Sequence, residues 1–293
     1  MENDWLKVQV SKKGAELMSI VNKDSGREYL WQGDPTYWKF RSPVLFPIVG
    51  AVCDNTYKID GKEYTMTIHG IARDYDFKLV KLAPSEAVYR LVSNDEMKAK
   101  YPYDFTLEIA YKLSLDEIKV SYKVVNPNDD TMYFQLGAHP GFNYMNFDPE
   151  AAVQGYYQFA DKKAGDKISV SRSNKDGFIV KKRESVTLSE DGTLPLTKST
   201  FNKDALVLEG NQAQEVALLD SNKKPYVRVK FDAPVVGLWS KGGDLYAPFV
   251  CIEPWYGRCD DANYKGEYKD KPWMQSLKAK DTFKSSISIV IEK

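Results

Sequence analysis

Apolar and polar residues alternate with a period of two along several stretches of the chain. Residues 105–111, 117–125 and 285–293 each place large apolar side chains at every second position, with mostly polar or small residues between them. This period predicts half-buried strands of antiparallel sheets that have one face on a core. Asp60 and Gly61 lie between two such segments, which indicates a two-residue hairpin, and residues 22–29 predict a further turn.

Helical patterns are few. Residues 93–101 predict a short helix that is capped by Ser93 or Asn94 and ends before Pro102, and a second short helix is expected between Asp260 and Tyr264. Strands follow one another without helices of about 10–15 residues between them, which excludes a doubly wound α/β fold and favours a sandwich. The polar residues 161–177 are expected to form a long loop or a mobile hairpin. We therefore predict one all-β domain over residues 1–293, a large antiparallel β-sandwich.

Composition and charge change this picture little. Apolar residues make up 43% and charged residues 28% of the chain, which is typical of a globular protein. Lysine plus arginine and aspartate plus glutamate both total 41, so the formal net charge is zero. A neutral chain has no global field that would attract nucleic acid or an anionic membrane. We expect neither as a partner.

The cysteines and the N-terminal residues bear on compartment and metals. The first residues, MENDWLKVQVSKKG, lack the basic and apolar regions of a signal peptide, and no apolar stretch is long enough to cross a bilayer. Three cysteines fit reduced thiols better than a disulfide framework. A cytoplasmic location is the resulting prediction. Since the chain has only two histidines and no CxxC or HExxH spacing, a dedicated zinc site is not expected.

Three predicted strands end in an ionisable residue that is followed directly by glycine or proline. These residues are His69 before Gly70, His139 before Pro140, and Glu253 before Pro254. Each has a simple structural interpretation, a hydrogen-bonded histidine or a salt-bridged glutamate. Strand ends are also where a rigid sheet can hold catalytic groups beside an open loop. Because the only two histidines share this setting with an apolar-flanked glutamate, a joint catalytic role is the alternative. No second carboxylate is expected to share the pattern.

Five segments carry a resemblance to a known family. They are, in order, LFPIVG (45–50), HGIARD (69–74), GAHPGF (137–142), NKDALVLEG (202–210) and PFVCIEPWYG (248–257). The ordered set resembles the aldose 1-epimerase or galactose mutarotase-like family, above all the bacterial members with HGxAR and CIEPW, and covers nearly the whole chain. The resemblance implies a large antiparallel β-sandwich, the supersandwich, with a sugar site on its concave face.

The resemblance also implies roles for individual residues. Glu253 matches the general base, His139 the general acid, and His69 a second histidine that hydrogen-bonds the sugar. Asp204 matches an aspartate that binds sugar hydroxyls, and Arg73 an arginine typical of the bacterial members.

Two positions depart from the family pattern. Relatives carry an arginine where this chain has Ala51, and classical galactose mutarotases carry one near Asn55. Asn55 is a candidate sugar contact, and the contribution of the missing arginines is either absent in this chain or supplied by Arg41 or Arg73. Aromatic residues cluster near Glu253, and a flat ring suits the C–H face of a pyranose; the four are Trp239, Tyr246, Trp255 and Tyr256.

The predicted activity is interconversion of the α and β anomers of a hexose. A base takes the proton of the anomeric hydroxyl, an acid protonates the ring oxygen, the ring opens, and it closes on the other face. The resemblance implies no cofactor and no metal. Two alternatives remain: a hexose-6-phosphate mutarotase, and a carbohydrate-binding or sensing protein with little catalysis. A glycosidase would usually need a second carboxylate. The expected partner is a small-molecule sugar, and the expected state is a monomer or homodimer.

Overall fold

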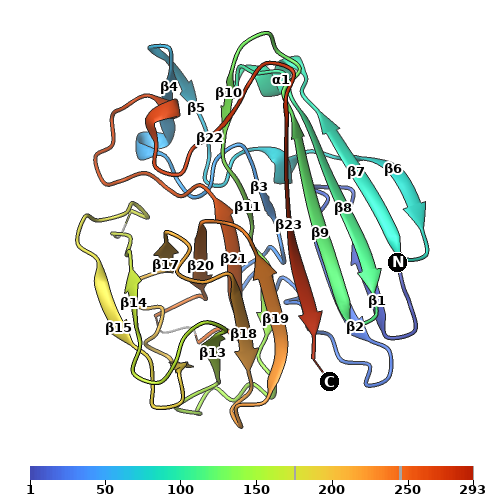
Figure 1. Cartoon of the computed structure of the whole chain (residues 1–293), viewed down its shortest axis with the longest axis vertical. Coiled ribbons are helices and arrows are strands. Elements are labelled where there is room, and N and C mark those ends of the chain that lie inside the picture. The colour runs from blue at the N-terminus through green and yellow to red at the C-terminus, as the bar shows by residue number, and fades with distance from the viewer. Residues whose placement is uncertain (175, 244–245, 293) are drawn as a thin grey trace.

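Antiparallel strands dominate the computed structural model, which describes residues 1–174, 176–243 and 246–292. The alternating pattern of the sequence predicts more than ten strands, and the described residues contain twenty-three. Two large sheets form the sandwich predicted from the sequence, with small hairpins at their margins (Figure 1). No helix in the described ranges is long and apolar enough to cross a membrane.

The larger sheet has nine strands in the order β16-β13-β18-β19-β23-β9-β8-β7-β6. Neighbouring strands in it are all antiparallel. Its strands are β6 (Lys78–Ala83), β7 (Glu86–Val92), β8 (Thr106–Ser114), β9 (Glu117–Val125), β13 (Gly155–Phe159), β16 (Thr193–Leu196), β18 (Glu215–Leu219), β19 (Pro225–Phe231) and β23 (Thr282–Ile291).

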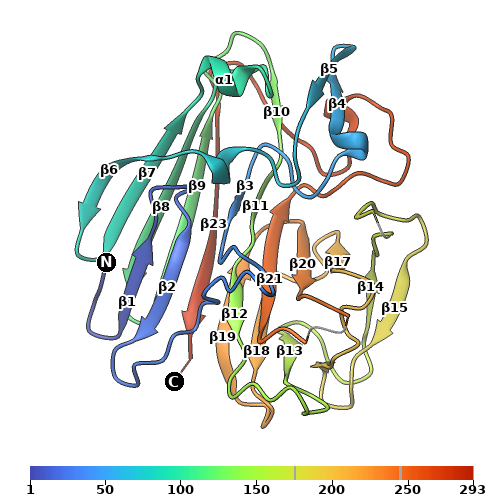
Figure 2. The ribbon, with the colours of Figure 1, turned by 180° about the vertical axis from the view of Figure 1, so that it is seen from behind.

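The second sheet has six strands and carries the ionisable residues of interest. Its order is β17-β20-β21-β11-β3, and β12 also pairs with β21. The strands are β3 (Val44–Leu45), β11 (Leu136–Ala138), β12 (Gly141–Asn143), β17 (Leu206–Glu209), β20 (Val235–Trp239) and β21 (Phe249–Tyr256). Seen from behind, β21, β11 and β12 cross the middle of the molecule (Figure 2).

Four two-stranded sheets complete the fold. They are β1 (Leu6–Val10) with β2 (Leu17–Asn22), β4 (Thr56–Ile59) with β5 (Lys62–Thr65), β10 (Met132–Phe134) with β22 (Gln275–Leu277), and β14 (Lys167–Val170) with β15 (Glu184–Thr187). The helical elements are α1 (Asp95–Lys98) and three short 3₁₀ turns, at Cys53–Asn55, Ala72–Asp74 and Tyr268–Asp270.

All eight residues of β21 are buried, on both of its faces. Val250, Ile252 and Tyr256 belong to the main core between the two sheets. The alternation of side chains along a strand then puts Cys251, Glu253 and Trp255 on the opposite face. The phenol of Tyr157 in β13 donates a 2.7 Å hydrogen bond to the carbonyl of Cys251, which ties the two sheets together at this point. A strand covered on both faces is a rigid support for a buried carboxylate.

Most local predictions from the sequence are confirmed. Residues at every second position of β9, from Ile118 to Val124, are buried. Asp60 and Gly61 join β4 to β5 with positive φ at both positions, as a type I′ hairpin requires, and the turn near residue 24 is present. The first helix is shorter than predicted, and Asn94 rather than Ser93 caps it by accepting the N–H of Met97.

One local prediction is wrong, and one of two alternatives is confirmed. The helix expected between Asp260 and Tyr264 is a turn, because Asn263 has φ +65° and Asp261 bridges to Ile179. The polar stretch 161–177 was expected to be a long loop or a mobile hairpin, and the structure has a hairpin strand there: Lys167–Val170 forms β14 and pairs with β15, and the side chains of Ile168 and Val170 are completely buried. Lys175, in the same stretch, lies outside the described residues.

Candidate active site

The register of the six-stranded sheet sets His139 opposite Glu253. β11 pairs Gly137 with Trp255, and β12 pairs Gly141 with Cys251, so both strands keep one register against β21. His139 and Pro140 are the two residues that separate β11 from β12. Continued through this gap, the register makes His139 the direct cross-strand neighbour of Glu253. Side chains in that relation point to the same face and lie close together.

The imidazole and the carboxylate accordingly meet. Nε2 of His139 lies 3.1 Å from Oε2 of Glu253, and the two residues are 6% and 1% exposed. No other hydrogen bond of good geometry reaches either carboxylate oxygen, and Nδ1 of His139 has no partner among the described residues. Buried polar atoms nearly always have partners. The unsatisfied atoms of this pair therefore indicate a place for a polar ligand.

Burial favours the neutral form of each group. Burial lowers the pKa of His139 to about 3. Burial, and next the charge of Asp204, raise the pKa of Glu253 well above its ordinary value, while Trp255 acts in the opposite direction. Burial thus favours a shared proton on the carboxyl group rather than on the imidazole. A nearby carboxylate favours the imidazolium form and burial opposes it; for His139 burial is the larger effect.

His69 approaches the same imidazole from a turn after β5. Its backbone has φ +67°, and the rings of His69 and His139 meet edge to face with centroids 5.4 Å apart. Nδ1 of His69 accepts the N–H of Gly50 at 3.1 Å, so the proton of the neutral ring is on Nε2. Burial, followed by the nearby His139 and Arg73, lowers the pKa of His69 well below its ordinary value. His69 is therefore a neutral donor at this site.

Glycine is required beside His69. Gly70 has φ +76°, and a Cβ there would lie 2.3 Å from the carbonyl oxygen of Phe46. The HG pair of the sequence is thus explained by close approach of two backbone segments.

His69, His139 and Glu253 line one cavity of about 550 Å³. Of the candidates named from sequence, His69, Arg73, His139, Asp204, Glu253 and Trp255 line it. The structure therefore brings together residues that are up to 184 positions apart. A cavity of this size accommodates a monosaccharide.

Comparison with known proteins agrees with this arrangement. A sequence model of the family described as aldose 1-epimerase matches residues 1–269. The chain belongs to the aldose 1-epimerase family. It is 30% identical over 299 residues to the chromosomal protein LacX of Lactococcus lactis subsp. lactis, covering 99% of this chain and 98% of that protein.

Two solved structures are also similar to this chain over its whole length. One is described as a galactose mutarotase related enzyme from Lactobacillus acidophilus, with a TM-score of 0.91, 31% identity, and coverage of 100% of this chain and 96% of that one. The other is a galactose mutarotase-like protein from Lactobacillus casei, with a TM-score of 0.92, 27% identity, and coverage of 100% and 99%.

Not every residue proposed from the aldose 1-epimerase resemblance reaches the cavity. Asn55 is exposed, with φ +53°, and is not among the lining residues. Arg73 lines the cavity and Arg41 does not, so of these two arginines Arg73 is available to the site. Ala51 also lines the cavity. Of the four aromatic residues, Trp239 and Trp255 line the cavity. Tyr256 points into the core, and the hydroxyl of Tyr246 donates to the carbonyl of Leu196.

The sequence reasoning missed one wall of the cavity. Tyr37, Trp38 and Phe40 line it, and the indole of Trp38 stacks on the imidazole of His139 with centroids 4.6 Å apart. The guanidinium of Arg73 lies 4.7 Å from the ring centre of Phe40. The signal was present as an aromatic-rich, proline-containing segment between two predicted strands, residues 31–40.

The indole of Trp255 depends on a glycine in the neighbouring strand. Gly237 of β20 lies opposite Glu253, and a Cβ at this position would lie 2.4 Å from the Trp255 ring. Nε1 of Trp255 is buried and has no hydrogen bond of good geometry among the described residues, but the indole N–H is close enough to Glu253 to lower the pKa of its carboxyl group. The ring thus fills the space that the glycine leaves, beside the carboxylate.

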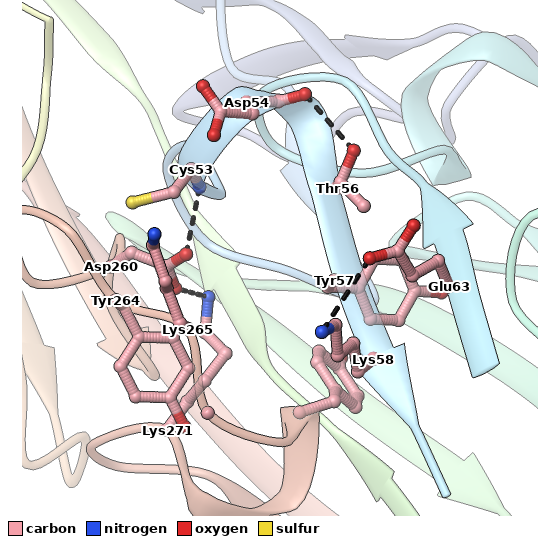
Figure 3. A pocket seen from close by; sticks show the side chains of 12 residues that line it. Cys53, Asp54, Thr56, Tyr57, Lys58, Glu63, Asp260, Tyr264, Lys265 and Lys271 are labelled. Atoms are coloured by element: carbon pink, nitrogen blue, oxygen red, sulfur yellow. Dashed lines mark hydrogen bonds and ion pairs between the residues drawn. The ribbon is translucent and has the colours of Figure 1, made fainter. Parts of the chain in front are cut away.

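A second cavity, of about 360 Å³, has a different character (Figure 3). The buried ammonium of Lys271 pairs with the carboxylate of Asp260, whose other oxygen accepts the N–H of Cys53 at 2.9 Å. The hydroxyls of Tyr264 and Tyr268 donate to backbone carbonyls. Since the buried groups of its wall have hydrogen-bond partners, the described residues of this cavity carry no comparable set of unsatisfied atoms.

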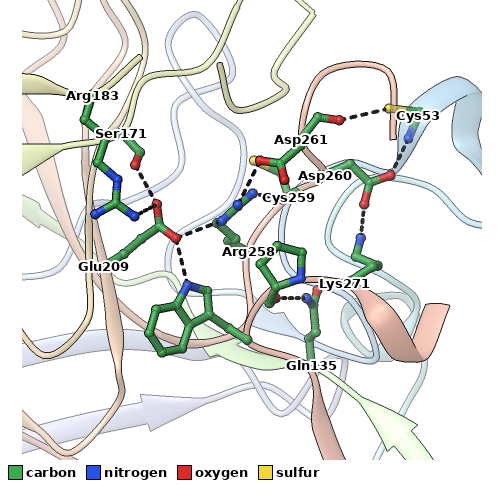
Figure 4. A network of polar contacts seen from close by, with 12 residues as sticks. Cys53, Gln135, Ser171, Arg183, Glu209, Arg258, Cys259, Asp260, Asp261 and Lys271 are labelled. Carbon is green, nitrogen blue, oxygen red and sulfur yellow. Dashed lines mark hydrogen bonds and ion pairs between the residues drawn. The ribbon is translucent and has the colours of Figure 1, made fainter. Parts of the chain in front are cut away.

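Glu209 corrects one expectation from the sequence. It ends the apolar strand β17 and precedes Gly210, so it does share the pattern of Glu253. Its carboxylate accepts four hydrogen bonds, some of them drawn in Figure 4: from Ser171 Oγ at 2.5 Å, Trp273 Nε1 at 2.7 Å, Arg258 Nε at 3.0 Å and Arg183 Nη2 at 3.3 Å. Glu209 does not line the sugar-sized cavity. It is therefore not the second carboxylate of a glycosidase.

Proposed function

We propose that the chain is an aldose 1-epimerase that interconverts the α and β anomers of a hexose. The observation that carries the proposal is the contact between His139 and Glu253, two buried groups 3.1 Å apart at the floor of a sugar-sized cavity. Family membership supports an isomerase of this kind, and the solved relative from Lactobacillus acidophilus is described as a galactose mutarotase related enzyme.

The chemistry needs one proton acceptor and one proton donor on the same sugar. In the proposed assignment Glu253 takes the proton of the anomeric hydroxyl and His139 protonates the ring oxygen, so the C1–O5 bond breaks. The open aldehyde rotates about C1–C2, and reversal of both proton transfers closes the other anomer. The neutral pair becomes competent when its shared proton moves from the carboxyl group to the imidazole. His69, a neutral Nε2–H donor, stabilises negative charge that develops on the sugar oxygen.

Sugar binding itself would make this proton transfer easier. Hydroxyl groups entering the cavity give both unsatisfied carboxylate oxygens and Nδ1 of His139 hydrogen-bond partners. Hydrogen bonds to a charged form favour that form, so the bound sugar lowers the pKa of Glu253 and raises that of His139. The acid and the base are then formed together, at the moment when substrate is present.

Polarimetry on freshly dissolved α-sugars tests the proposal. A panel of free hexoses is expected to include at least one whose approach to equilibrium is accelerated by the protein and not by a Glu253→Gln variant. Glu190→Gln, at an exposed position, is the matched control and keeps the wild-type rate. If no free or phosphorylated sugar is accelerated, although one binds in equilibrium dialysis, the chain is a binding protein and the enzymatic proposal fails.

A second candidate is a mutarotase of phosphorylated hexoses. Three cationic side chains, of Lys39, Arg73 and Lys241, line the cavity, and the two lysines are exposed. This arrangement suits a phosphate held at the rim while the ring reaches Glu253. The same panel with hexose 6-phosphates decides between the two: for a phosphosugar enzyme, Lys241→Gln raises KM for the phosphorylated sugar and leaves a free sugar unaffected.

A further inference from the structure

Cys251 lies beside the catalytic pair. It is two residues before Glu253 on β21, so its side chain is on the same face of the strand, and it is completely buried. The sequence suggests an inert core thiol at this position. In the structure a ring nitrogen of His139, Sγ of Cys251 and a carboxylate oxygen of Glu253 all lie within 4.8 Å of one another.

This spacing is close to that of a metal site. Around tetrahedral Zn²⁺, with bonds of about 2.0–2.3 Å, neighbouring ligand atoms are roughly 3.5 Å apart. The His139–Glu253 contact of 3.1 Å is already near this value, and small side-chain rotations bring the sulfur in. The carboxylate oxygens of Glu253, a residue only 1% exposed, have no hydrogen bond of good geometry. These oxygens therefore keep lone pairs that a cation can take.

We propose that His139, Cys251 and Glu253 form a binding site for a thiophilic divalent cation, with Zn²⁺ or Cd²⁺ as the class. A thiolate with an imidazole selects such ions over Mg²⁺ or Ca²⁺, which prefer oxygen ligands. On binding, the thiol of Cys251 and the carboxyl group of Glu253 each release a proton to the buffer, and their bonds to the metal take the place of these protons. Three protein ligands leave the fourth position to water.

Inhibition follows from the identity of the ligands, and this part rests on the proposed function. An ion that holds the lone pairs of His139 and Glu253 prevents both from exchanging protons with a sugar. Metal and sugar should therefore compete. A sequence search for zinc motifs cannot find this site, because two of its ligands are on one strand and the third is more than a hundred residues away.

The binding test uses Cd²⁺ as the probe and the full chain. Wild type is expected to develop the ultraviolet thiolate-to-cadmium charge-transfer band, and Cys251→Ala to lose it. Cys53→Ala, which removes a half-buried thiol bound to the carbonyl of Asp261, is the matched control and keeps the band. Cys251→Ser is measured in parallel, with circular dichroism on each variant to establish folding. Absence of the band in wild type, or its persistence in folded Cys251→Ala or Cys251→Ser, overturns the proposal.

The inhibition test uses Zn²⁺ on anomer exchange, with each variant compared with its own metal-free rate. The concentration of Zn²⁺ for half inhibition should rise at least about tenfold in Cys251→Ala, as loss of a direct ligand costs no less than loss of an outer partner. It should also rise with sugar concentration, and Mg²⁺ should have no effect. Equal inhibition of Cys251→Ala and wild type contradicts the site. If no sugar is turned over at all, the proposed function fails, and the cadmium band still decides the metal site.

Discussion

Two buried glutamates in one sheet differ in nearly everything except their sequence setting. Glu209 at the end of β17 and Glu253 in β21 each follow an apolar run and precede glycine or proline. Glu209 accepts four hydrogen bonds; Glu253 has one ion-pair contact and no other partner of good geometry. Although burial raises the pKa of Glu209, the donors Ser171 and Trp273 and two arginines lower it below its ordinary value, whereas Glu253 moves the opposite way.

The difference distinguishes a glutamate that holds segments together from one that can bind a ligand. A carboxylate whose lone pairs are all used can hold segments together and cannot bind a substrate. A buried carboxylate without donors destabilises the fold and is tolerated where a ligand supplies what is missing. Glu209 joins β17 to Arg258, just after β21, and to Ser171, so it braces the wall around the cavity, while Glu253 is left free to react.

Replacement of Glu209 should give the largest loss of stability. Glu209→Gln removes one of the two carboxylates paired with the buried guanidinium of Arg258 and leaves only that of Asp261, and breaking a buried pair costs up to about 3–5 kcal/mol. The free energy of unfolding in urea measures the effect. Glu184→Gln, at a partly exposed carboxylate paired with Arg172, is the control and should change stability by less than about 1 kcal/mol. Equal, small effects of both would show that the network carries little energy.

Replacement of Glu253 should have the opposite profile. Glu253→Gln keeps the shape of the side chain and removes the base, so anomer exchange should fall by at least about 10²-fold. The free energy of unfolding should not decrease, because the carboxylate has little to lose. Polarimetry and urea unfolding on the same preparation provide both values. A variant that exchanges anomers at the wild-type rate, or that unfolds as easily as Glu209→Gln, would erase the distinction between the two glutamates.

The support under Glu253 can be tested at Gly237. Gly237→Ala places a methyl group where Trp255 now lies, and overpacking of this kind costs about 1–3 kcal/mol. The displaced indole should also lower kcat, since it neighbours the base. Normal stability and kcat in Gly237→Ala would mean that the ring has room to move.

His139 should make stability depend on pH below its ordinary pKa. In the unfolded chain this histidine takes up a proton as pH falls through about 6.5, while burial lowers its folded pKa to about 3. The unfolded state then binds more protons, so wild type loses stability as pH falls, by about 1.4 kcal/mol per pH unit from this group.

His139→Asn lacks that contribution. Its free energy of unfolding, minus that of wild type, should rise as pH is lowered from 6.5 towards 3. In activity, the alkaline limb of a bell-shaped profile belongs to loss of the proton shared with Glu253, and it should disappear in this variant together with most of the rate. If His139→Asn keeps both the rate and the alkaline limb, His69 becomes the better acid.

Much of the architecture could be predicted because period-two patterns are local. The strands around Ile118 and the Asp60–Gly61 hairpin depend on neighbours in sequence, and so did their prediction. The predictions that fail concern features that depend on contacts between residues far apart in the sequence. The turn at Asn263, for example, follows from the bridge of Asp261 to Ile179. The role of Glu209 was missed for the same reason, since its donors come from three separate segments. Asn55 was predicted at the site from the resemblance alone, and in the structure it lies in an exposed turn outside the cavity lining.

The pairing of His139 with Glu253 through sheet register has a consequence for protein engineering. Under the proposed function the reacting groups are held by the sheet, whereas Ser173, Gly177 and Ile179 of the cavity wall come from a connecting segment. Loop libraries or grafts from relatives at residues 173–179 can therefore vary substrate preference with the least disturbance of the proton chemistry. Trp38 and Trp239 are to be kept, because both rings contact the imidazole of His139. Insertion of a single residue in β11 or β21 would instead turn one partner to the wrong side of the sheet. The sheet register of β11 and β21 must therefore be kept when connecting segments are diversified.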